Sequence, residues 1–83
     1  MIKIKEINAH NYNTPCTLRD RGTKIGLADQ NWVNTIFSEG QKSFLKNSNA
    51  VFRRHPKNYS VIEIFVDEQS IDSKQITMLH LLF

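Results

Sequence analysis

The sequence is short of the residues that most often build a chemical site. It holds a single cysteine, Cys16, so no internal disulfide can form, and one cysteine with three scattered histidines does not supply a zinc site. We therefore expect a reducing compartment and a cytoplasmic protein. No apolar run approaches the roughly 18 residues of a membrane-spanning helix. The alternating start, Met-Ile-Lys-Ile-Lys-Glu, is not typical of a signal peptide.

Glycine is scarce as well. Of Gly22, Gly26 and Gly40, no two stand at the spacing of a P-loop or of a dinucleotide-binding loop. We expect no cofactor and no metal on these grounds. Cys16 has no nearby histidine or aspartate in the sequence that would mark it as a nucleophile. The sequence therefore indicates no catalytic residue.

The residues that are present favour one small globular domain over residues 1–83. A chain of 83 residues can bury one modest core. Its net charge is +3, but the part up to residue 58 is basic and the remainder is acidic. Such asymmetry favours a partner with a strong field, such as nucleic acid or an acidic protein surface. The alternative is that these charges only solvate the exterior.

The first strand is expected over residues 2–7, where isoleucine alternates with lysine. This pattern predicts a half-buried strand that turns Lys3 and Lys5 to water. Twenty residues with few apolar side chains follow it. Within them Thr14-Pro15 can start a short helix over 15–21, with Gly22 closing it.

Residues 30–47 carry an apolar stripe at helical spacing, and Asp29 can cap the helix. The stripe comprises Trp32, Val33, Ile36, Phe37, Phe44 and Leu45. Gly40 and a capping box at 38–41 leave two alternatives, one continuous helix or two helices that separate near residue 38. A stripe of this kind belongs to the core far more often than to a ligand site.

A β-hairpin is expected next. Residues 50–54 and 59–66 flank a turn at 55–58, and the second strand is largely apolar on both faces, as in a central strand. Glu63 is the exception on that strand. We expect its carboxylate either at the rim of the sheet or paired with a neighbour.

The last segment, 75–83, is ambiguous. As a helix capped by Asp72 it would gather three apolar residues on one face, but the β-branched pair Ile76-Thr77 and the hairpin spacing favour a strand. The predicted order is then β-α-α-β-β-β. It indicates an α+β fold, a small two-layer sandwich with an antiparallel sheet of three to four strands packed on one or two helices.

The basic cluster around the hairpin turn is the best candidate for a partner-binding surface. Arginine offers a two-pronged donor to phosphate, and an aromatic side chain beside it can stack on a base. Because side chains alternate along a strand, Arg53 and Arg54 are expected to face opposite sides, and a solvated turn is the alternative. The predicted partner-binding residues are Lys42, Lys46, Arg53, Arg54, His55, Lys57 and Tyr59.

Histidine has the ordinary pKa that suits acid–base work, and the chain has His10, His55 and His80. His80 stands among leucines in the segment favoured as a strand. We expect it to have a structural role, with its ring nitrogens hydrogen-bonded inside the protein.

Three stretches resemble the N-terminal half of GNAT acetyltransferases. "IKIKEINAHNY" is similar to the first strand and helix of that family, "SEGQKSFLKNSNA" to the second helix, and "PKNYSVIEIFVDEQ" to a later strand. The family's acetyl-CoA loop is missing. The resemblance therefore implies a truncated or repurposed half that does not bind acetyl-CoA, and it carries over no catalytic residue.

A second resemblance is to RelE/HigB-type ribonuclease toxins, which are small, basic and built in the same order. "FLKNSNAVFRRHPKNYSVIEIFV" looks like their middle hairpin. The resemblance implies mRNA cleavage by Arg53, Arg54, His55 and His80. The family's basic C-terminal segment is lacking, since residues 67–72 are acidic.

We predict a small non-enzymatic binding or regulatory protein, such as an inhibitor of the phage or plasmid type. Its basic face would engage nucleic acid, a nucleoprotein or an acidic protein surface, and no membrane. The alternatives are the mRNA-cleaving toxin and the acetyltransferase half. A homodimer is compatible with each.

Overall fold

The computed structural model describes residues 1–8, 22–58 and 60–83. The elements are strand β1 (Ile2–Asn8), strand β2 (Thr23–Lys24), 3-10 helix η2 (Ile25–Leu27), helix α1 (Gln30–Ile36), helix α2 (Glu39–Asn47), strand β3 (Val51–Arg54), strand β4 (Val61–Val66), 3-10 helix η3 (Glu68–Ser70) and helix α3 (Ser73–Leu82). The short helix expected over 15–21 lies outside the described residues. In the described part of the chain, no helix combines the length and apolarity needed to cross a membrane.

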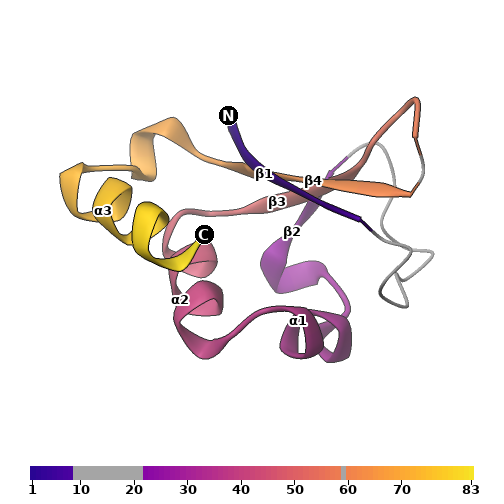
Figure 1. The fold of residues 1–83 in the computed structure, drawn as a ribbon, viewed down its shortest axis with the longest axis horizontal. Coiled ribbons are helices and arrows are strands. Elements are labelled where there is room, and N and C mark those ends of the chain that lie inside the picture. The colour runs from indigo at the N-terminus through magenta and orange to yellow at the C-terminus, as the bar shows by residue number, and fades with distance from the viewer. Residues whose placement is uncertain (9–21, 59) are drawn as a thin grey trace.

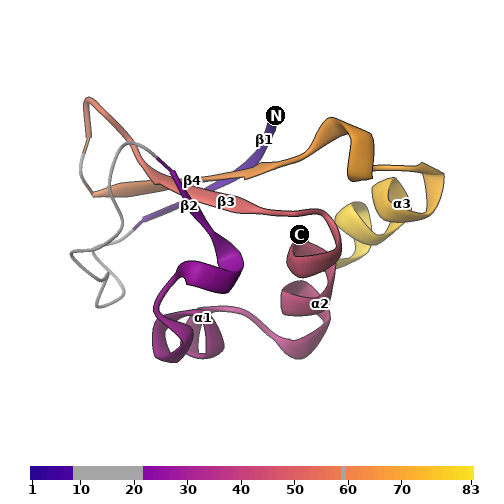
Figure 2. The ribbon, with the colours of Figure 1, turned by 180° about the vertical axis from the view of Figure 1, so that it is seen from behind.

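The sheet is antiparallel and has the strand order β1-β4-β3-β2. Figure 1 shows it as one layer, with α1 and α2 below it, α3 toward one end and the β3–β4 turn at the other; Figure 2 shows the same arrangement from behind. The predicted α+β sandwich is confirmed. The hairpin and the central position of its second strand, β4, are confirmed with it.

The core lies between the helices and the inner face of the sheet. Phe52 of β3 and Ile62, Ile64 and Val66 of β4 are fully buried there. The rings of Phe37 and Phe52 stack with centroids 5.6 Å apart, and Trp32 meets Phe52 edge-on at 5.4 Å. The apolar stripe of residues 30–47 is therefore core, as expected from its spacing.

That stripe is carried by two helices, which decides between the two alternatives. Asp29 caps α1 by accepting the backbone N–H groups of Asn31 and Trp32. The backbone is extended at Phe37, and α2 then starts with a complete capping box between Ser38 and Gln41. Two local caps thus end one helix and begin the next.

The last segment is a helix, so the prediction of a strand over 75–83 was wrong. Asp72 caps α3 by accepting the backbone N–H of Gln75 at 2.9 Å. The inner side of α3 packs on the core through Met78, Leu79, Leu82 and Phe83. Cap and packing together outweigh the weak strand preference of one β-branched pair. The fourth strand of the sheet is β2, and not the segment 75–83.

His80 is consequently exposed on α3, and the structural role expected for it in a buried strand does not hold.

Helix α3 lies close to α2. A Cβ added at Gly40 would come within 3.1 Å of the Leu82 side chain, and Gln41 donates from its side chain to the Leu82 carbonyl. The glycine that interrupts the apolar stripe thus allows the two helices to approach.

A register shift in β1 decides which side chains reach the outer face of the sheet. Lys3 is paired with Phe65. A bulge at Ile4 then shifts the register by one residue. Beyond the bulge, Lys5 pairs with Ile64 and Glu6 pairs with Glu63. Directly paired residues share a face. Lys5 therefore lies on the helix side of the sheet, with its ammonium 6.0 Å from the ring centroid of Phe83. It is exposed to water as expected, but the expectation that it shares a face with Lys3 was wrong.

Candidate functional site

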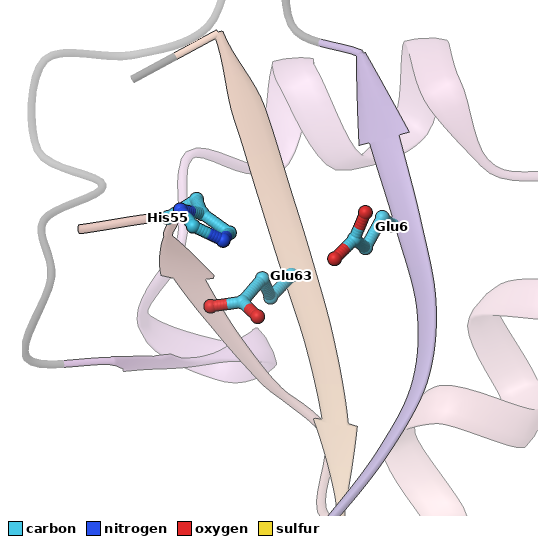
Figure 3. Close-up of side chains that lie close together, drawn as sticks. All are labelled: Glu6, His55 and Glu63. Atoms are coloured by element: carbon cyan, nitrogen blue, oxygen red, sulfur yellow. The ribbon is translucent and has the colours of Figure 1, made fainter. Parts of the chain in front are cut away.

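Five charged or titratable side chains meet on the outer face of the sheet. We call Lys3, Glu6, Arg53, His55 and Glu63 the sheet-face cluster. The register sets Glu6 of β1, Glu63 of β4 and Arg53 of β3 side by side across three strands. Lys3 approaches from the preceding part of β1, and His55 follows β3 directly (Figure 3).

Glu63 is the buried centre of this cluster, with its side chain only 5% exposed. Its Oε1 accepts from Arg53 Nε at 3.0 Å and from Arg53 Nη2 at 2.8 Å, and its Oε2 accepts from Lys3 Nζ at 3.3 Å. The hydrogen bonds from Arg53, above all, hold the pKa of Glu63 below its ordinary value, against the opposing effect of burial. Of the two expectations for Glu63, pairing with a neighbour is the one observed.

Toward the described residues, the two cations of the cluster use only some of their N–H donors. Lys3 binds Glu6 at 2.8 Å and Glu63, and these bonds raise the pKa of Lys3, the bond to Glu6 most. Arg53 uses two of its five N–H groups on Glu63 and covers the ring of Phe65, with Cζ 4.7 Å from the centroid. Both cations are partly exposed, so their remaining N–H groups can meet a ligand on the open face.

His55 has a defined orientation in the cluster. Its Nδ1 accepts the backbone N–H of Lys57 at 3.1 Å, so the neutral ring carries its proton on Nε2. A nitrogen of His55 and carboxylate oxygens of Glu6 and Glu63 all lie within 4.8 Å of one another. Figure 3 shows Glu63 between His55 and Glu6.

One histidine and two carboxylates at this spacing are a donor set for a divalent cation, but the surroundings do not suit one. A metal on Nε2 would require the ring proton on Nδ1, where the N–H of Lys57 already points. Arg53 and Lys3 also neutralise the carboxylates without a metal. The oriented His55 ring and the two cations therefore make this cluster a poor site for a divalent cation.

The predicted basic side is divided between two ends of the molecule. Lys42 on α2 is engaged by Asn34 and Glu39, whereas Lys46 on the same helix is exposed. Arg54 stands opposite Ile62, on the other side of β3 from Arg53, as expected from the alternation. In Figure 1 helix α2 and the β3–β4 turn, which carries the exposed Lys57, lie far apart. Tyr59 lies outside the described residues.

A second feature is a groove of about 770 Å³ beside β2, which we call the β2 groove. Its lining residues are Met1, Lys24, Ile25, Gly26, Leu27, Lys46, Asn49, Ala50, Val51 and Asp67. Ile25 and Ala50 are buried in its floor, and Leu27 on its rim is 79% exposed. Lys24 and Lys46 are exposed, and neither has a hydrogen bond or ion pair with the described residues.

Two parts of these sites were not indicated by the sequence. Glu6 drew no attention because simple alternation from Ile2 places it on the inner face, and only the bulge turns it outward. Lys24 lies in a two-residue strand, too short for any periodicity to show. Glu63 did carry a signal, as the single carboxylate within an apolar strand.

Comparisons with protein-family models, curated proteins and solved structures return no match. The resemblances to acetyltransferases and to ribonuclease toxins therefore stay predictions.

Proposed function

We propose that this protein is a binding protein that holds an acidic, partly apolar segment of another protein in the β2 groove. One observation carries the proposal: Lys24 and Lys46, two cations with no hydrogen bond or ion pair to the described residues, line a groove with an apolar floor. An acidic side chain of the partner would meet these ammonium groups. An apolar side chain of the partner would cover Ile25 and the exposed Leu27.

The chemistry of the groove favours a protein segment over nucleic acid. Among the described residues, its lining contains aliphatic side chains, two lysines and one carboxylate, that of Asp67, but no aromatic ring and no arginine. Single-stranded nucleic acid is usually held by aromatic stacking and by the planar fork of arginine. A lysine ammonium beside aliphatic surface, as in this groove, can bind a partner segment in which a carboxylate stands next to a leucine or phenylalanine.

The test is a binding titration with a defined acidic peptide. The probe is a fluorescein-labelled 12-residue peptide that alternates glutamate with leucine, and the readout is fluorescence anisotropy at low and moderate salt. We expect Lys24→Ala with Lys46→Ala to weaken binding by about three- to tenfold, because two partly exposed ion pairs are lost. Leu27→Glu should weaken it further, since it places a carboxylate on the rim.

The matched control is the double variant Lys57→Ala with Lys74→Ala, which removes the same charge from exposed sites outside the groove lining. It should bind the peptide as the parent protein does. Equal weakening in both double variants would contradict the groove and indicate unspecific charge attraction. If a 12-nucleotide RNA or DNA strand bound more tightly than the peptide, the partner would be nucleic acid and not a protein segment.

A further inference from the structure

We propose that the partner segment held in the β2 groove continues in extended form across the outer face of the sheet, where it presents an acidic, an apolar and a second acidic side chain at positions i, i+2 and i+4. The inference rests on the proposed function, because it concerns the same segment. It adds a second contact surface and a rule for the partner's sequence, which the groove alone does not provide.

One row of directly paired residues crosses the outer face of the described sheet from β2 to β1. Directly paired residues share a face, and Phe65 lies between two core residues of β4, so the row points away from the helices. We call this row, which consists of Lys24 of β2, Val51 of β3, Phe65 of β4 and Lys3 of β1, the outer row. It carries a lysine at each end and two apolar side chains in the middle.

The outer row is continuous with the β2 groove, since Lys24 and Val51 belong to both. Its apolar middle is accessible, because Val51 and Phe65 are only half-buried while α1 and α2 pack on the opposite side of the sheet (Figures 1 and 2). Arg53 covers part of the Phe65 ring. A side chain at Gly22 would collide with Val51, since its Cβ would lie 2.8 Å from Val51 Cγ1, so glycine there leaves room over the row. A segment that leaves the groove at Lys24 therefore meets apolar surface next.

The charges of the outer row fit a segment with two carboxylates. Lys24 has no hydrogen bond or ion pair with the described residues. The ammonium of Lys3 is shared between Glu6 and Glu63, but its side chain is 43% exposed and can donate to a further acceptor. Lys3 should therefore contribute less to binding than Lys24.

The length of the outer row favours an extended segment over a helical one. Three strand-to-strand spacings separate Lys24 from Lys3, which is about 14 Å in total. In an extended chain, residues i and i+4 point to the same side and lie about 13 Å apart, with i+2 between them. In a helix the same two positions are only about 6 Å apart. An extended segment can thus place a carboxylate on each lysine while its central side chain covers Val51.

The test compares two fluorescein-labelled peptides of 12 residues that have the same composition and charge. The spaced peptide repeats Glu-Ser-Leu-Ser three times, so one side of the extended chain alternates glutamate with leucine. The block peptide places three Glu-Ser units before three Leu-Ser units. We expect the full chain to bind the spaced peptide about three- to tenfold more tightly in fluorescence anisotropy, because only this peptide sets a leucine over the apolar middle while carboxylates meet both lysines.

Lys3→Met tests the far end of the outer row, and Lys5→Met is its matched control. Lys5 stands on the same strand and carries the same charge, but the bulge at Ile4 places it on the helix side of the sheet. Lys3→Met should weaken binding of the spaced peptide by about two- to fivefold and remove most of its advantage over the block peptide. Lys5→Met should leave that advantage unchanged.

The outcomes distinguish this inference from the proposed function. Equal affinities of the parent protein for the two peptides, while Lys24→Ala with Lys46→Ala weakens both, would overturn the outer row and keep the groove. An advantage of the spaced peptide that survives Lys3→Met, or that Lys5→Met removes equally, would also overturn the outer row. If the groove double variant bound both peptides as the parent does, the groove would fail and the outer row with it. The comparison of the two peptides uses the unmodified chain, so it does not depend on the folding of any variant.

Discussion

The two faces of β4 are held by different physical forces. On the inner face Ile62, Ile64 and Val66 are fully buried against the helices. On the outer face Glu63 is also buried, at 4% exposed, and there the side chains that cover it are its ion-pair partners. Apolar burial stabilises in proportion to area and tolerates many partners, whereas a buried carboxylate depends on particular donors. The inner face therefore sets the fold, and the outer face is where chemistry can be placed.

The largest effect is expected from breaking the inner face. Phe52→Ala should lower the free energy of unfolding by about 3–5 kcal/mol, because it opens a cavity beneath Trp32 and Phe37. Small domains have about 5–15 kcal/mol in total, so this variant should be close to unfolding. Urea denaturation followed by circular dichroism measures the change.

The matched control is the same substitution on the outer face. Phe65→Ala removes a half-buried ring that lies under Arg53, and we expect a loss of about 1–2 kcal/mol. If both variants lost the same amount, the outer face would be as much a part of the core as the inner one.

An intermediate effect is expected from breaking the ion pair. Arg53→Met should cost about 1–3 kcal/mol, because Glu63 keeps only the longer bond to Lys3. Adding Glu63→Leu should recover most of that loss, since a buried pair can often be replaced by apolar side chains. Urea denaturation of the single and double variants gives both numbers. A double variant less stable than the single one would contradict this account.

The same pair predicts the response to acid. The pKa of Glu63 in the folded chain lies below the ordinary value of 4.5, so its stabilisation is complete above pH 4.5 and is lost as pH falls through the lower, folded pKa. The parent protein should lose this contribution between pH 4.5 and strong acid. The double variant, which lacks the carboxylate, should lose correspondingly less over that range.

The smallest effect is expected at Trp32, on the inner side. Its indole Nε1 is buried and has no hydrogen-bond partner among the described residues. Trp32→Phe removes that unsatisfied donor together with some apolar contact, and the two changes oppose each other. We expect less than about 1 kcal/mol in a thermal melt. A loss of several kcal/mol would indicate that the N–H has a partner.

The sequence predicted most of the inner face because hydrophobic periodicity reports burial directly. The stripe over residues 30–47 and the apolar alternation of β4 both follow from it, and Asp29 and Ser38 indicated the helix starts. The segment at 75–83 failed because short apolar runs fit strand and helix equally well. Packing against the core makes this segment a helix, and the local sequence does not report that packing.

The outer face was less predictable because it depends on register between strands far apart in the sequence. Arg53 and His55 were selected from the basic cluster, but their neighbours Glu6 and Glu63 stand opposite each other only after the shift at Ile4. No periodicity within a single strand reveals such a shift. The β2 groove was unpredictable for a related reason, since its described lining residues come from five separate parts of the chain.

The bulge at Ile4 also bears on self-association. In the described sheet β1 is an outermost strand, and such an edge offers backbone N–H and C=O groups to any other extended chain. A bulge breaks the even spacing of those groups and increases the local twist, so a straight strand cannot add along the whole edge. The irregularity that turns Glu6 to the outer face thereby also discourages one molecule from templating the aggregation of the next.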